Sequence, residues 1–79
     1  MSVRVDLSLI LRKYRPDYDP DQGLVLDDGA GKRLCQIVQE IGIPLEEVSS
    51  ILVNHRAVQP TAVAEDGDAI LLTSAIGGG

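Results

Sequence analysis

The residues with the clearest chemical potential are the last three, Gly77-Gly78-Gly79, which follow a regular apolar segment. Glycine has no Cβ, so Gly77 and Gly78 can enter a narrow channel in another protein with φ values that are closed to other residues. A terminal carboxylate has a pKa of about 3.5, so it is ionised at neutral pH and reacts as an acyl group only after another enzyme has adenylated it. We therefore expect a carrier that enzymes modify at Gly79, rather than an enzyme. The alternative is a frayed chain end without chemistry.

A glycine-rich run, Gly29-Ala30-Gly31-Lys32-Arg33, looks like part of a phosphate-binding loop. The full motif needs a glycine where Leu26 stands, and it needs Ser or Thr directly after the lysine, where Arg33 stands. Because both requirements fail, we interpret the run as a turn that leads into a helix.

Three acidic residues, Asp17, Asp19 and Asp21, have the spacing that opens a calcium-binding loop. A calcium loop needs glycine where Gln22 stands, a bidentate Glu further on, and flanking helices. None of these is present, so we interpret the segment as an acidic surface loop.

The remaining candidate residues are single or local. Cys35 is the one cysteine, which excludes an internal disulfide, and His55 is the one histidine, which argues against a zinc site. We expect Cys35 to be a thiol that is buried or at the boundary of the core and His55 to lie in an exposed turn, with no metal or cofactor bound by the chain itself. A basic cluster of Arg12, Lys13 and Arg15 is interpreted as a solvated edge that discourages aggregation, with contact to a partner as the alternative.

Length and composition restrict the function further. A chain of 79 residues with 44% hydrophobic content predicts one small globular domain, residues 1–79, with an aliphatic core because Phe and Trp are absent. The net charge of −5 argues against nucleic-acid binding. No apolar run approaches the ~20 residues of a membrane span, and no signal peptide is recognisable, so we expect a cytoplasmic protein without a membrane partner.

The first third of the chain has the pattern of a strand, a loop and a second strand. Apolar residues alternate with mostly polar ones at Val3, Val5, Leu7, Leu9 and Leu11. This period of two predicts a half-buried strand over residues 3–11. Prolines and aspartates predict a loop over residues 13–22, which is followed by a short strand over 23–27 and a turn over 28–31.

The rest of the chain predicts one helix and three strands. Four apolar residues lie at i, i+3, i+4 and i+7, which places them on one helix face: Leu34, Ile37, Val38 and Ile41. Gly42 stands where a left-handed C-terminal cap belongs, and Pro44 prevents continuation. We expect a possible extra turn over residues 45–48, strands over 50–53, 57–58 and 69–73, and turns over 54–56 and 65–68. A single amphipathic helix must pack across a sheet, so the fold class is α+β with a mixed four- to five-stranded sheet.

The order of these features resembles the sulfur-carrier branch of the ubiquitin-like β-grasp proteins. That branch includes the small subunit of molybdopterin synthase and the sulfur carrier of thiamine biosynthesis. The resemblance covers nearly the whole chain and depends on Leu52-Val53-Asn54 with Val58, on Glu65-Asp66-Gly67-Asp68-Ala69-Ile70, and on Ile76-Gly77-Gly78-Gly79. The chain departs from the family pattern at His55, where a turn glycine is usual, so this turn is expected to be wider or of another type. Further departures lie at Ala64 and at Ser74-Ala75.

The resemblance implies a mechanism and partners. A ubiquitin-activating-type adenylyltransferase would adenylate the Gly79 carboxylate with MgATP, and persulfide sulfur would displace AMP to leave a thiocarboxylate. Gly77 and Gly78 would thread into the partner, and Ile76 would anchor against an apolar patch. The second partner would be the large molybdopterin synthase subunit, favoured by the long 13–22 connection, or a thiazole synthase. Two other hypotheses stay open, namely a ubiquitin-like protein modifier and an interaction module with a fortuitous glycine tail.

Overall fold

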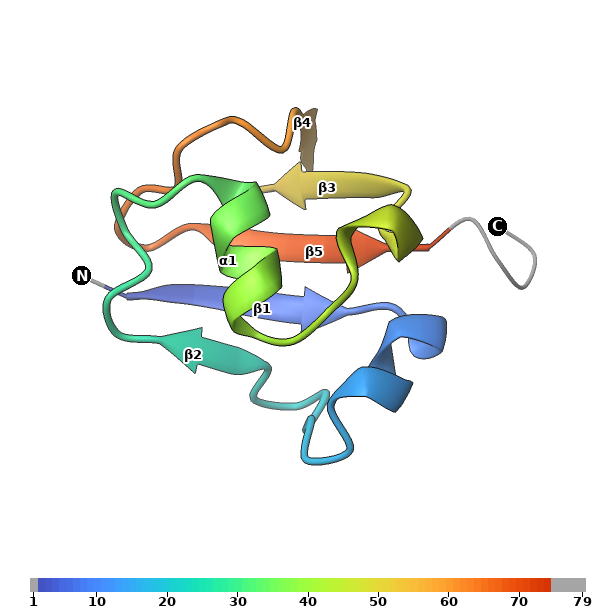
Figure 1. The fold of residues 1–79 in the computed structure, drawn as a ribbon. Helices are drawn as coiled ribbons and strands as arrows, with labels where there is room; N and C mark the ends of the chain where they lie inside the picture. Colours follow the sequence, from blue (N-terminus) through green and yellow to red (C-terminus); the bar gives the residue numbers. More distant parts are fainter. Residues whose placement is uncertain (1, 75–79) are drawn as a thin grey trace.

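The structure is a computed structural model, and it describes residues 2–74. Five strands form one sheet in the order β2-β1-β5-β3-β4 (Figure 1). β1 and β5 are parallel, and the other neighbouring pairs are antiparallel. The strands are β1 Val3–Leu7, β2 Leu24–Leu26, β3 Ser50–Val53, β4 Arg56–Val58 and β5 Ala69–Thr73.

One face of this sheet is covered by α1, Leu34–Glu40, which crosses in front of the central strands (Figure 1). The predicted helix stripe is buried, and Gly42 has φ +84°, so the left-handed residue after the helix is confirmed. Alternate residues of β1 and β5 supply the other half of the core, because successive strand side chains point to opposite faces. The fully or nearly buried apolar residues are Val3, Val5, Leu7, Leu11, Leu34, Ile37, Val38, Ile41, Ile43, Ile51, Ala64, Ile70 and Leu72. This arrangement is the ubiquitin-like β-grasp fold.

The prediction of one strand over residues 3–11 is wrong beyond Leu7. Leu7 pairs with Leu72 in the last register pair between β1 and β5, and the Ser8 N–H makes the last bond to β5, at the Leu72 carbonyl. The chain turns instead into a 3-10 helix, η1, Leu9–Tyr14. This turn buries Leu11, which is 0% exposed, and leaves Leu9 77% exposed. The alternation of apolar residues therefore continues in the sequence after the strand itself has ended.

The acidic segment after η1 is held against β1 by side-chain hydrogen bonds. The Tyr18 hydroxyl donates to the Asp6 carboxylate at 2.9 Å, and Arg4 donates to the same carboxylate at 3.1 Å. The Arg12 guanidinium lies 5.1 Å from the centre of the Tyr18 ring. Burial is the main cause that raises the pKa of Tyr18, so its hydroxyl stays protonated and continues to donate. The long connection is thus tied to the sheet through Asp6.

The β3–β4 hairpin turn has two central residues, Asn54 and His55, with φ of +52° and +72°. Positive φ at both positions is what a two-residue hairpin turn of type I′ requires. The turn is therefore not widened by His55, and β4 begins at Arg56, one residue earlier than predicted. The Asn54 side chain accepts a hydrogen bond from the Ala69 N–H at 3.0 Å and donates to Asp68 at 3.1 Å. The other predicted strands and the single turn at η2, Leu45–Glu47, agree with the structure to within one or two residues.

Candidate functional site

The predicted modification site follows β5, and the end of β5 is fixed from both sides. The Ser8 N–H donates to the Leu72 carbonyl at 3.0 Å, and the Ser49 N–H donates to the Thr73 carbonyl at 2.8 Å. One bond comes from the segment after β1 and the other from the segment before β3. The predicted site residues Ile76, Gly77, Gly78 and Gly79 lie outside the described residues, so their roles stay predictions.

Two short helices flank this end of β5, η1 after β1 and η2 before β3 (Figure 1). We call the two helices, together with Ser8 and Ser49, the exit collar, because the chain continues from Ser74 into its glycine-rich segment at this point. The collar is assembled from segments more than thirty residues apart in the sequence. Its position is determined by the sheet order, since β5 lies between β1 and β3.

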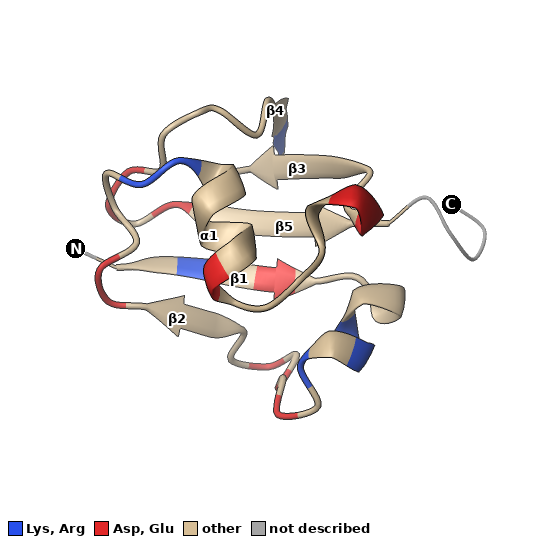
Figure 2. Cartoon of the chain, in the orientation of Figure 1, with Lys and Arg blue, Asp and Glu red and all other residues tan. Residues whose placement is uncertain are grey.

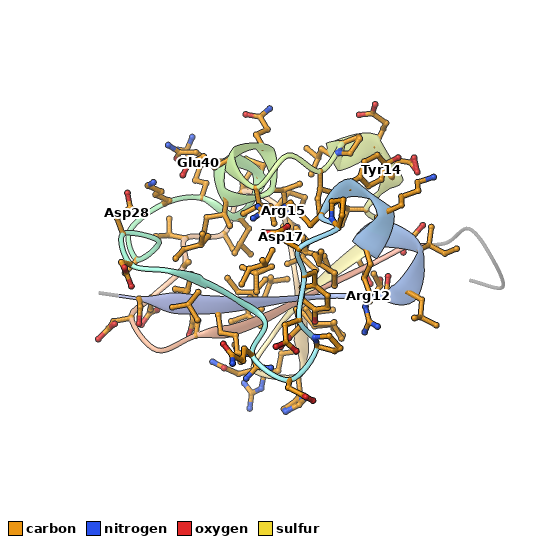
Figure 3. The ribbon with its side chains drawn as sticks, turned by 90° about the horizontal axis from the view of Figure 1, so that it is seen from below. Arg12, Tyr14, Arg15, Asp17, Asp28 and Glu40 are labelled. Carbon is orange, nitrogen blue, oxygen red and sulfur yellow. The ribbon has the colours of Figure 1, made fainter. Side chains whose placement is uncertain are left out.

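The two halves of the exit collar are joined by a hydrogen bond between side chains. The Tyr14 hydroxyl donates to a Glu47 carboxylate oxygen at 2.6 Å, a short distance typical of a bond to a charged acceptor. This bond is the main cause that raises the pKa of Tyr14, with burial second. Directly after η1, the Arg15 guanidinium donates to the Ile41 carbonyl at 3.2 Å, which ties the end of η1 to the end of α1. Figure 3 shows Tyr14 and Arg15 on the same side of the molecule, toward α1 and η2.

Hydroxyl groups surround the end of β5 inside the exit collar. The Thr73 hydroxyl is hydrogen-bonded to the hydroxyls of Ser49 and Ser50. The Ser8 hydroxyl and the second Glu47 carboxylate oxygen are buried without a hydrogen-bond partner among the described residues. The last strand therefore leaves the sheet through polar surroundings, while its alternate residues Ile70 and Leu72 stay in the apolar core.

The face of the sheet opposite α1 is open and carries an apolar hollow. Leu71 of β5 is 36% exposed and lies opposite Leu52 of β3 in the strand register. A hollow of about 160 Å³ is lined by these two residues together with Ala69, Asp6 and His55. Because most of its lining surface is apolar, the hollow suits an aliphatic side chain.

The alternative ligand sites considered from the sequence are occupied by internal contacts. Lys32 is paired with Glu40 at 2.8 Å and with Asp28 at 3.3 Å, and the Glu40 bond is the main cause that raises its pKa. This lysine is therefore neutralised within the fold, as expected for a turn that leads into a helix.

The acidic segment is likewise engaged with its own neighbours. Asp17 is bound to Arg15 at 3.1 Å, which lowers the pKa of Asp17, and the Asp19 side chain accepts the Asp21 N–H at 2.9 Å. Between residues 2 and 74, no group of three or more potential ligands is placed to hold a metal ion. Cys35 is a half-buried free thiol, and His55 is exposed in its turn, as predicted.

The exit collar could not be recognised from the sequence. Tyr14 and Glu47 are 33 residues apart, and no local pattern connects them. One available signal was Tyr14 itself, since it is one of only two tyrosines in a chain without Phe or Trp.

Among residues 2–74, none of the helices has the length and the apolar composition that a membrane span requires.

Comparison with known proteins agrees with this fold. The sequence matches the family described as Mut7-C ubiquitin over residues 6–73, which includes every helix and all strands except the start of β1. A comparison with curated proteins found no match. The family match and the sheet topology both indicate a ubiquitin-like domain, and the chain belongs to the Mut7-C ubiquitin family.

Proposed function

We propose that this chain is a sulfur carrier that is activated by a partner at the Gly79 carboxylate and contributes no catalytic group of its own. The carboxylate attacks the α-phosphorus of MgATP held by an adenylyltransferase, which gives an acyl adenylate and pyrophosphate. The terminal sulfur of a persulfide then attacks the acyl carbon and AMP leaves. A thiol reductant cleaves the resulting acyl disulfide and releases the Gly79 thiocarboxylate.

The observation that carries this proposal is the fixed end of β5 in a ubiquitin-like fold. Hydrogen bonds from the Ser8 and Ser49 N–H groups hold the last carbonyls of the strand, so the residues that follow start from a defined position. A defined start reduces the conformational entropy that is lost when a tail enters a partner's channel. Gly77 and Gly78 then thread into the channel, and Ile76 contacts an apolar patch at its mouth.

The body of the domain supplies recognition in this proposal. The hollow over Leu52 and Leu71 accepts an aliphatic side chain of the adenylyltransferase. The acceptor of the sulfur is the large subunit of molybdopterin synthase, with a thiazole synthase as the alternative. Dependence on ATP and on a thiol reductant is consistent with a cytoplasmic location.

The test has two steps. Intact-mass measurement of the natural protein first establishes whether Gly79 is its last residue, which the proposal requires. The purified chain is then incubated with an adenylyltransferase from the same genome, MgATP and a persulfide donor, and we expect a mass increase equal to one oxygen-to-sulfur exchange. Covalent attachment to lysines of other proteins would favour a modifier. Unchanged function after one residue is appended to Gly79 would favour an interaction module.

The variant Gly78→Val tests the threading step. A β-branched side chain at this position should clash inside a channel that fits only backbone, so we expect loss of thiocarboxylate formation with an unchanged melting temperature. Matched replacement of exposed Val63 by Ile is the control and should leave both quantities unchanged. Normal thiocarboxylate formation by Gly78→Val would contradict the threading role.

A further inference from the structure

The exit collar carries opposite charge on its two sides. Figure 2 shows blue basic residues on η1 and red acidic residues on η2, one on each side of the end of β5. The basic residues in the last turn of η1 are Arg12 and Lys13, and the acidic residues of η2 are Glu46 and Glu47. The charges are therefore separated across the point where the chain leaves the sheet.

The charges on η1 are not neutralised by a carboxylate in the part of the chain that the structure describes. Arg12 donates to the Leu7 carbonyl at 3.0 Å and lies over the Tyr18 ring, and Lys13 lies 5.2 Å from the centre of the Tyr14 ring. Neither cation has a carboxylate partner among residues 2–74, whereas nearby Arg15 is paired with Asp17.

The opposite side of the collar has a free anion of its own. Glu46 is exposed, and no ion pair joins it to another residue of the described chain. Tyr14 holds Glu47 in place by the hydrogen bond between the two halves. Because Tyr14 and Glu47 are bonded to each other, the separation of charge is built into a fixed scaffold.

We propose that this charge separation sets the orientation in which the carrier docks on its adenylyltransferase. The enzyme surface around the channel is acidic where it meets Arg12 and Lys13 and basic where it meets Glu46. The inference rests on the proposed function for the identity of the partner. A threaded tail alone leaves the domain free to rotate about it, and two opposite charges on either side remove that freedom.

The same arrangement argues against a polyanion as the ligand. Nucleic acid or an anionic membrane surface would be attracted to Lys13 but repelled by Glu46 on the other side of the exit, in a chain whose net charge is −5. A protein surface can present both signs at once. The occupant of this surface is therefore a protein with a charge pattern complementary to the collar.

The test reverses the charge separation without changing net charge. The double variant Lys13→Glu/Glu46→Lys exchanges the two signs and keeps the net charge at −5. The matched control Arg56→Glu/Glu65→Lys exchanges two exposed charges near the start of β5, at the opposite end of that strand. Binding of each purified full chain to the purified adenylyltransferase is measured by calorimetry, and melting temperatures confirm folding.

We expect the reversed collar to raise Kd about tenfold or more and the control to change Kd less than about twofold, because like charges meet across the interface only in the first case. The difference should shrink between about 0.05 M and about 0.5 M salt. Each single substitution should give part of the effect. An unchanged Kd for the reversed collar, or no binding of the wild-type chain, would overturn the inference.

Adenylation is read separately, by pyrophosphate exchange at saturating carrier. Pyrophosphate exchange together with an unchanged Kd for the reversed collar would contradict the docking inference and support the sulfur-carrier proposal. Binding that depends on the collar but gives no pyrophosphate exchange would support the docking inference and contradict the sulfur-carrier proposal.

Discussion

Replacing His55 by glycine should stabilise the protein, although the substitution removes a whole side chain. His55 has φ +72° as the second central residue of the β3–β4 turn. The left-handed conformation costs an L-residue about 1–2 kcal/mol, and most of that strain disappears in glycine. Glycine loses about 0.5–1 kcal/mol more chain entropy on folding. The difference predicts an increase of about 0.5–1 kcal/mol in the free energy of unfolding.

The structure indicates that little is lost with the imidazole. His55 is exposed, and no hydrogen bond or ion pair joins its side chain to another residue within 2–74. Urea unfolding followed by far-UV circular dichroism measures the change, since the chain has no Trp for fluorescence. A gain of this size corresponds to a rise in melting temperature of about 2–8 °C for a domain of this length.

Two control variants separate backbone strain from other effects. Asn54→Gly also relieves a positive φ, but it removes the side-chain bonds to Asp68 and Ala69, so we expect it to be less stable than His55→Gly. His55→Val places a β-branched residue at φ +72° and should lose stability relative to the wild type. If His55→Gly is less stable than the wild type, or if His55→Val matches it, the strain argument is refuted.

Two further predictions concern the exit collar. Leu11→Ala should lower the free energy of unfolding by about 2–5 kcal/mol in urea, because it opens a cavity under η1, whereas Leu9→Ala at the exposed position should change it little. Tyr14→Phe should remove one high-pKa tyrosine from an ultraviolet titration. Because the folded pKa of Tyr14 is raised, its contribution to stability is complete below about pH 10 and is lost as the pH rises through that pKa. Tyr14→Phe should therefore weaken the loss of stability at alkaline pH. Tyr18→Phe should remove only the separate contribution of Tyr18, whose pKa is also raised.

Several elements of the fold could be predicted because their signals are local. The stripe from Leu34 to Ile41 predicts a helix through its period, and Gly42 marks the end of that helix because a left-handed residue is needed there. Strands β3 and β5 have the predicted bounds. The predicted length of β1 was wrong because the alternation of apolar residues indicates which face is buried but not how far the neighbouring strand extends.

The same distinction between local signals and long-range contacts applies to the candidate site. The chemistry expected at Gly77, Gly78 and Gly79 comes from residue types alone and needs no knowledge of the fold. The surroundings of that tail depend on contacts over long distances, such as Tyr14 with Glu47 and Ser49 with Thr73. These contacts are not visible to a pattern of period two or 3.6.

The sequence by itself thus determined the kind of element at most positions, the aliphatic core and the possible chemistry of the glycine-rich end, because each depends on side-chain type and spacing along the chain. Only the tertiary structure decided that η1 and η2 lie on either side of β5 and that their charges are separated across its end. The physical reason is that pairing of β5 between β1 and β3 brings the two helices together. That pairing depends on burying both strands against one core, which is a property of the whole chain.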